Sequence, residues 1–104
     1  MKLWTVWLDY LMTGEGRTKM ALIALAETEF AAIEKFQERF GEYFAQGCQA
    51  EEGLQRNSVV KLLFSKSVMD SIEDASTKGG VEAFASLYTE FNASGQKDLL
   101  GSYT

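Results

Sequence analysis

The hydrophobic pattern of the first 26 residues is typical of two β-strands joined by a turn. Residues 18–26 are apolar on both faces, which indicates a central strand covered on both sides. Residues 3–12 alternate more strictly, with a mixed face opposite an apolar face made of Trp4, Val6, Leu8, Tyr10 and Met12. Because Gly14 and Gly16 lie between the two runs and favour a tight reversal, we expect a β-hairpin.

At Thr28 the period changes, and residues 29–40 have the spacing of an amphipathic helix. Thr28 is the expected N-cap, because its hydroxyl can accept a hydrogen bond from an amide of the first turn. Gly41 is well placed to end the helix. The side of the helix that is predicted to face the core carries Phe30, Ile33, Phe36 and Phe40.

The pattern after Gly41 is less regular. Residues 42–50 predict a third strand, interrupted by Gly47, and a polar loop follows over 51–57. Residues 58–77 have helical spacing, with a break near residues 65–67 that leaves one helix or two open. A clear alternation over 81–91 predicts the last strand.

Together these elements predict an α+β fold in the order β-β-α-β-α-β. We expect one domain over residues 1–92, followed by a flexible C-terminal tail over 93–104. Right-handed crossovers favour a two-layer sandwich, in which a four-stranded antiparallel or mixed sheet carries two helices on one face.

The composition restricts the chemistry that this chain can perform. It contains no histidine and a single cysteine, Cys48, so imidazole bases, His-activated nucleophiles and cysteine-rich zinc sites are excluded. We therefore expect no metal and no cofactor, and the sequence favours a binding protein over an enzyme. A lone cysteine gives no reason to expect an oxidising compartment, so the cytoplasm is the default location. The apolar run over 20–26 is far shorter than the roughly 20 residues that cross a membrane, so we expect no membrane span.

The net charge of −5 is concentrated in one part of the chain. Residues 26–52 contain seven acids and two bases, whereas the rest of the chain holds eight of each. This region should repel phosphate backbones, so nucleic acid is not an expected partner. Within it, Glu34 and Glu38 alternate with Lys35 and Arg39, which is typical of a solvated helix surface.

The aromatic residues carry the main functional hypothesis. If both helices cover one face of the sheet, the other face exposes an apolar surface too large for a soluble monomer. Its predicted members are Trp7, Leu11, Tyr43, Phe84 and Tyr88. We therefore expect a homodimer formed through this aromatic sheet face or through a sheet edge. The alternative is that these side chains form a second core within the subunit.

Two further hypotheses belong to other classes of protein. The first is a small-molecule binder or cofactor-free enzyme, with an apolar ligand in a pocket near Asp9 at the dimer interface. In it Asp9 is the weak catalytic candidate, because an apolar setting can raise the pKa of a carboxylate. The simpler interpretation is that Asp9 faces water or pairs with Arg17 or Lys19 across the hairpin. The second hypothesis is an acidic inhibitor or decoy that occupies a basic site on another protein.

Overall fold

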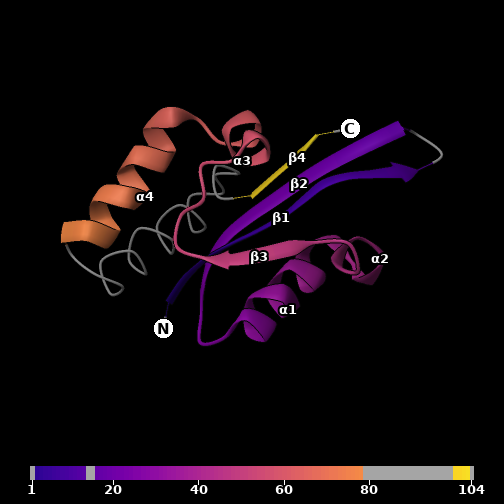
Figure 1. Ribbon diagram of the computed structural model, residues 1–104, viewed down its shortest axis with the longest axis horizontal. Coiled ribbons are helices and arrows are strands. Elements are labelled where there is room, and N and C mark those ends of the chain that lie inside the picture. Colours follow the sequence, from indigo (N-terminus) through magenta and orange to yellow (C-terminus); the bar gives the residue numbers. More distant parts are fainter. Residues whose placement is uncertain (1, 14–15, 79–99, 104) are drawn as a thin grey trace.

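The computed structural model describes residues 2–13, 16–78 and 100–103, and its fold is α+β, as predicted (Figure 1). Its centre is an antiparallel hairpin of β1 (Lys2–Thr13) and β2 (Gly16–Ala26). Val6 lies opposite Leu22 in this hairpin, and the register shifts between Leu8 and Leu11. The two predicted strands are thus present and are paired with one another.

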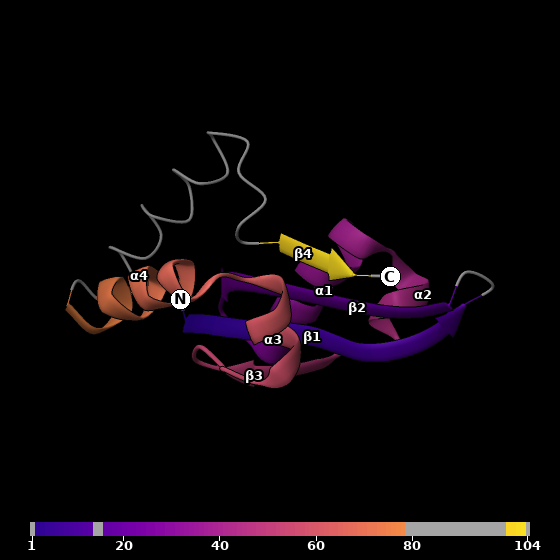
Figure 2. The same cartoon turned by 90° about the horizontal axis from the view of Figure 1, so that it is seen from above.

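Two short strands extend the hairpin on its two sides. β3 (Gln49–Glu52) pairs with β1 and β4 (Leu100–Tyr103) pairs with β2, so the strand order is β3-β1-β2-β4. Figure 2 shows β3 and β4 at opposite edges of the sheet. All the described pairings are antiparallel. The predicted strand over 81–91 lies outside the described residues.

The predicted strand over 42–50 is largely wrong. Glu42–Ala45 form the short helix α2, and β3 begins only at Gln49. The run Tyr43-Phe44-Ala45 is apolar without alternation, and a helical turn lets Phe44 and Ala45 pack together against the core. Gly47 follows at a close approach, where an added Cβ would lie 3.2 Å from Leu8.

The placement of two helices on one face of the sheet is also wrong, because helices cover both faces (Figure 2). On one face, α1 (Glu29–Phe40) packs Ala32 and Phe36 against the strands. On the other, buried residues of α3 (Ser58–Leu63) and α4 (Lys66–Lys78) form a second cluster with the strands. The physical reason is that β2 is apolar on both sides, so each side needs its own cover.

The first core contains Val6, Leu8, Met20, Leu22, Ala24, Ala26, Ala32 and Phe36. The second contains Ala21, Ile23, Leu25, Val59, Val60, Phe64, Met69 and Ile72. Successive residues of β2 therefore alternate between two cores, as the period of a strand requires.

Helix ends follow the capping residues of the sequence. Thr28 Oγ1 accepts from the Ala31 amide at 3.1 Å, and Gly41 ends α1 at φ 104°, so both predicted caps are confirmed. The helical region over 58–77 is two helices, because Phe64 adopts an extended conformation between α3 and α4. Asn57 caps α3 through a 2.9 Å bond from the Val60 amide, and Ser65 Oγ accepts from the Val68 amide at 3.2 Å.

One buried hydroxyl holds the connection between β3 and α3. Thr5 on β1 is fully buried, and its Oγ1 donates to the Gly53 carbonyl at 2.7 Å. The same oxygen accepts from the Gln55 amide at 3.0 Å. Both backbone groups of the loop are therefore satisfied by a single side chain of the sheet.

We expect Thr5→Val to lower the free energy of unfolding by about 1–3 kcal/mol, because it leaves the Gly53 carbonyl and Gln55 amide without a partner. Urea unfolding of the purified protein measures this change. Thr5→Ser keeps the hydroxyl and is the control. A Thr5→Val protein as stable as wild type would show that the loop does not depend on this oxygen.

Charged contacts connect α4 to the same loop. Arg56 donates to Asp70 at 2.8 Å and to Glu73 at 2.5 Å, and Lys66 lies 2.7 Å from the second oxygen of Asp70. The hydrogen bonds from Lys66 and Arg56 hold the pKa of Asp70 below its ordinary value. Because the pKa is lowered in the folded state, this contribution to stability is present at neutral pH and is lost as the pH falls through the lowered pKa.

We therefore expect Asp70→Asn to lower the melting temperature at pH 7, and this deficit to shrink as the pH falls through the lowered pKa of the wild-type carboxyl. Thermal unfolding followed by circular dichroism across this pH range measures the difference. Asp74→Asn, which removes only an exposed pair with Lys78, is the matched control. An Asp70→Asn deficit that does not change with pH would contradict this account.

Candidate functional site

The predicted aromatic surface is not assembled among the described residues. Trp7 is half-buried and packs against the core under α3 and α4, so the helix-free sheet face that the hypothesis required is absent there. Tyr43 lies on α2, which packs on the opposite face, and its side chain is 60% exposed. The side chains of Leu11, Phe84 and Tyr88 lie outside the described residues. Of the predicted set, Tyr43 alone is described as an exposed ring.

Asp9 is in a polar setting. Its carboxylate is 63% exposed and lies 3.7 Å from the ammonium of Lys19 across the hairpin. This agrees with the simpler interpretation of Asp9, and within the described residues no apolar enclosure of the carboxylate is found. The described residues that line a groove of about 320 Å³ beside the start of β1 include Lys2, Leu3 and Glu52, and Asp9 is not among them.

Cys48 is the other group with reactive potential. The thiol is half-buried, and this burial raises its pKa, with a backbone hydrogen bond acting in the opposite direction. A thiol with a raised pKa is protonated at neutral pH and is a poor nucleophile.

The most distinctive surface of the described structure runs along the outer side of α1 and onto α2. Phe30 is 71% exposed there, although the helical arc placed it with the core residues, and that expectation is wrong. Phe30 stands in the first turn, about 120° around the helix axis from fully buried Phe36, as the 100° step per residue requires. The ring therefore lies beyond the edge of the sheet-facing side.

Three carboxylates continue from Phe30 along the same stripe. Phe30, Glu34, Gln37, Glu38 and Glu42 together line an open groove of about 440 Å³. The spacing of four residues from Phe30 to Glu34 to Glu38 is the spacing that places side chains on one side of a helix. The groove thus has a ring at one end and acids along its length.

This stripe is not neutralised by the bases that alternate with it in sequence. Lys35 turns inward, and its ammonium donates to the Leu25 carbonyl of β2 at 2.5 Å. Within the described residues, Glu34, Glu38 and Glu42 make no ion pair. The solvated surface expected from the sequence is confirmed for Glu34, Glu38 and Arg39, which are exposed, whereas Lys35 is turned toward the sheet.

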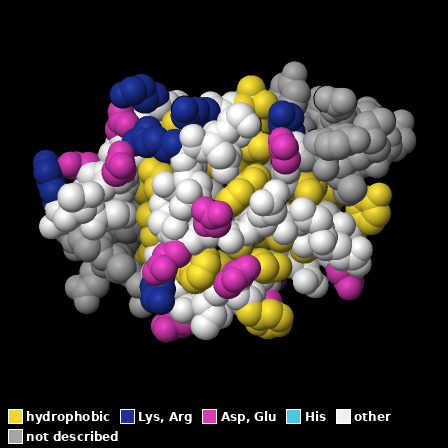
Figure 3. Space-filling model, viewed as in Figure 1, with side chains coloured by type: hydrophobic (Ala, Val, Ile, Leu, Met, Phe, Trp, Pro, Cys, Tyr) yellow, Lys and Arg dark blue, Asp and Glu magenta, His cyan; other side chains and the backbone are white. Residues whose placement is uncertain are grey.

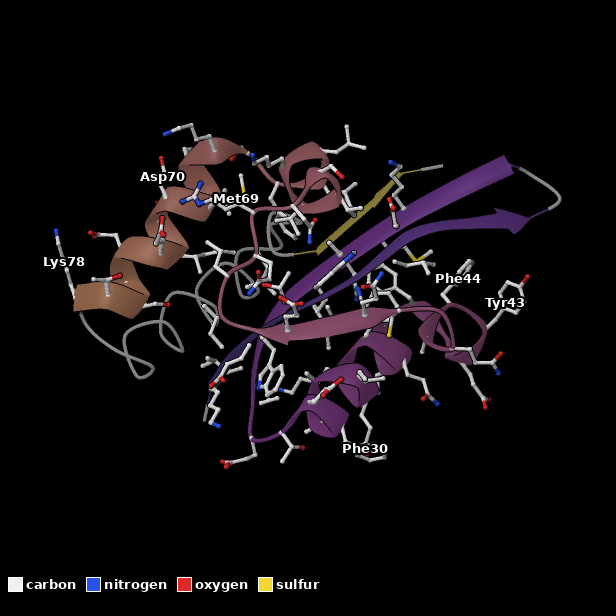
Figure 4. All side chains as sticks on the ribbon, viewed as in Figure 1. Phe30, Tyr43, Phe44, Met69, Asp70 and Lys78 are labelled. Atoms are coloured by element: carbon white, nitrogen blue, oxygen red, sulfur yellow. The ribbon has the colours of Figure 1, made fainter. Side chains whose placement is uncertain are left out.

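Apolar side chains are also present on α1, α2 and β3. Tyr43 contacts Phe44, with ring centroids 5.3 Å apart, and half-buried side chains of Phe40, Phe44 and Ala50 form the rim of the first core. Figure 3 shows hydrophobic and acidic side chains interspersed over β3, α1 and α2, whereas most Lys and Arg side chains lie in the upper part of the view. In Figure 4, Phe30 and Tyr43 project outward from α1 and α2. We call Phe30, Glu34, Glu38, Glu42 and Tyr43 the acidic face.

Comparison with protein-family models, with curated proteins and with solved structures returns no match. Among the described helices, none has the length and apolar character needed to cross a membrane. In the same part of the chain, no three acidic or cysteine side chains are grouped as a metal site would need.

The acidic face should carry a small cost in stability, because Glu34 and Glu38 are like charges one helical turn apart. We expect Glu38→Gln to raise the free energy of unfolding by about 0.3 kcal/mol at low salt, and by less at high salt. Urea unfolding at two ionic strengths measures this effect. A loss of stability in Glu38→Gln would show that the carboxylate has a structural role.

Proposed function

We propose that this protein is a binding module whose acidic face contacts a basic surface of another protein. One observation carries the proposal: the exposed ring of Phe30 lines one groove with three carboxylates that have no ion-pair partner among the described residues, and a second exposed ring, Tyr43, follows Glu42 on α2. Exposed aromatic rings are the side chains that most often supply affinity in protein interfaces. Unpaired carboxylates supply charge complementarity and accelerate encounter with a positively charged partner.

The charge distribution supports a protein partner over a nucleic acid. Residues 26–52 carry the whole net charge of −5, and they include the acidic face and β3. Such a surface repels phosphates and attracts lysine and arginine side chains. An inhibitor or decoy that covers the basic site of another protein is the form of this function that the charges favour. We place the module in the cytoplasm, because a single cysteine gives no reason to expect an oxidising compartment.

The other expected functions have less support in the described structure. A homodimer through the aromatic sheet face would need that face to be open, and α3 and α4 pack against it. A ligand pocket near Asp9 would need an enclosed carboxylate, and Asp9 is exposed and paired with Lys19. Both remain measurable through the solution mass and through ligand screening.

The test of the proposed function compares variants of the acidic face. Proteins captured from a lysate of the source cells at low salt, and released at high salt, are identified and purified, and their dissociation constants are measured. We expect the Glu34→Gln, Glu38→Gln, Glu42→Gln triple variant to bind about tenfold more weakly at low salt and to lose most of the salt dependence. Phe30→Ala should weaken binding about tenfold at every salt concentration.

Leu62→Ala is the matched control for Phe30→Ala, because Leu62 is a 52% exposed apolar residue of α3, on the other side of the sheet. It should leave the dissociation constant unchanged. If all these variants bind every captured protein as wild type does, the acidic face is not the binding surface.

A further inference from the structure

The backbone hydrogen bonds of β3, the edge strand beside the acidic face, show which of its residues direct their amides and carbonyls outward. The Gly53 amide donates to the Leu3 carbonyl at 2.7 Å, which continues the β1–β3 ladder by one residue. In an antiparallel pair, alternate residues direct both backbone groups toward the partner strand. Gln49 and Glu51 therefore bond to β1, and Ala50 and Glu52 direct their amides and carbonyls away from it.

Within the described part of the chain, most of these outward groups have no hydrogen-bond partner. The Glu52 carbonyl accepts from the Gln55 side chain at 2.9 Å. The Ala50 amide, the Ala50 carbonyl and the Glu52 amide have no partner within the described residues. β3 thus offers two donors and one acceptor in a row, which is the pattern that an added strand recognises.

The side chains of β3 restrict which strand can be added. Consecutive residues lie on opposite faces of the sheet, so Glu51 is on the α3 side and Glu52 is on the α1 side, where Ala50 packs on the first core. Both glutamates are exposed, and an exposed ion pair with Lys2 at 3.6 Å offsets the charge of Glu52 only in part. A complementary strand needs two adjacent basic residues opposite Glu51 and Glu52 and a small or apolar residue opposite Ala50.

A second copy of the chain does not meet this requirement. If β3 paired with itself around a two-fold axis, the glutamates of one copy would lie opposite or diagonal to those of the other. Like charges on facing strands destabilise the pair, as is usual for protected sheet edges.

We propose that β3 binds an extended segment of the partner protein, which adds to the sheet as an antiparallel strand and carries two adjacent Lys or Arg residues followed by an apolar one. This inference rests on the proposed function, since the same basic partner meets the acidic face of α1, which packs beside β3. Main-chain hydrogen bonds to β3 hold the segment in the sheet, and its two basic residues distinguish it from other extended segments.

The test uses an eight-residue peptide of alternating threonine and valine with two adjacent lysines at its centre, the second lysine being followed by valine. Its binding is followed by the shifts of the Ala50 and Glu52 amide signals in nitrogen–proton NMR spectra. Each peptide amide is then methylated in turn, because a methylated amide can neither donate nor fit against a neighbouring strand. We expect methylation at alternate positions to weaken binding by at least about fivefold, and methylation at the positions between them to have little effect.

A protein variant gives an independent readout. Ala50→Pro removes the outward amide, while the β1–β3 ladder does not use that amide, so the fold should persist and peptide binding should fall by at least about fivefold. Ala50→Val keeps the amide and is the matched control. If Ala50→Pro fails to fold, peptide methylation on the wild-type protein still decides the question.

The outcomes separate this inference from the proposed function. Methylation effects with a period of two residues support strand addition. Salt-sensitive binding with no such period overturns strand addition and leaves the acidic face as the binding surface. Absence of binding at millimolar peptide, or self-association that Ala50→Pro abolishes, also overturns strand addition by a basic segment.

Discussion

The architecture depends on the burial of both faces of β2. Every residue from Met20 to Ala26 is buried, and the side chains alternate between two separate cores. A strand of this kind is stable only when each face is covered, because apolar surface left in water costs free energy in proportion to its area. Helices on both sides of the hairpin meet this requirement. The surfaces left for contact with other molecules are then the outer sides of the helices and the edges of the sheet.

The sequence predicted the parts of the fold that local chemistry determines. The hairpin, the Thr28 cap and the end of α1 at Gly41 were predicted and are confirmed, because each depends on residues close together in the chain. The apolar run of residues 18–26 already indicated cover on both sides. The handedness rule for strand-helix-strand crossovers instead predicted both helices on one face of the sheet, which is a two-layer fold. The packing of α3 and α4 on the second face of the sheet depends on contacts between residues far apart in the chain, which the local residue pattern does not determine.

The candidate site was predictable only in part. Tyr43 was selected as an exposed ring and is exposed, but the strand assigned to it is a helical turn. Phe30 was assigned to the core because its helical angle lies close to that of Ile33, and a helix wheel does not show where the sheet ends. The acids were visible in the sequence as a concentration of charge. Whether they are paired depends on the directions of the Lys35 and Arg39 side chains, which spacing along a helix does not determine. Lys35 bonds to the sheet, and exposed Arg39 makes no ion pair with these acids.

The bond from Lys35 to the Leu25 carbonyl also limits how α1 can move. It joins the middle of the helix to the end of β2, and Phe36 anchors the helix to the sheet. Rotation of α1 about its own axis would therefore break a charge-assisted contact. The carboxylates on the outer side are consequently presented by a rigid support. A surface that is already ordered loses little conformational entropy when it associates, so even a small contact area can sustain useful affinity.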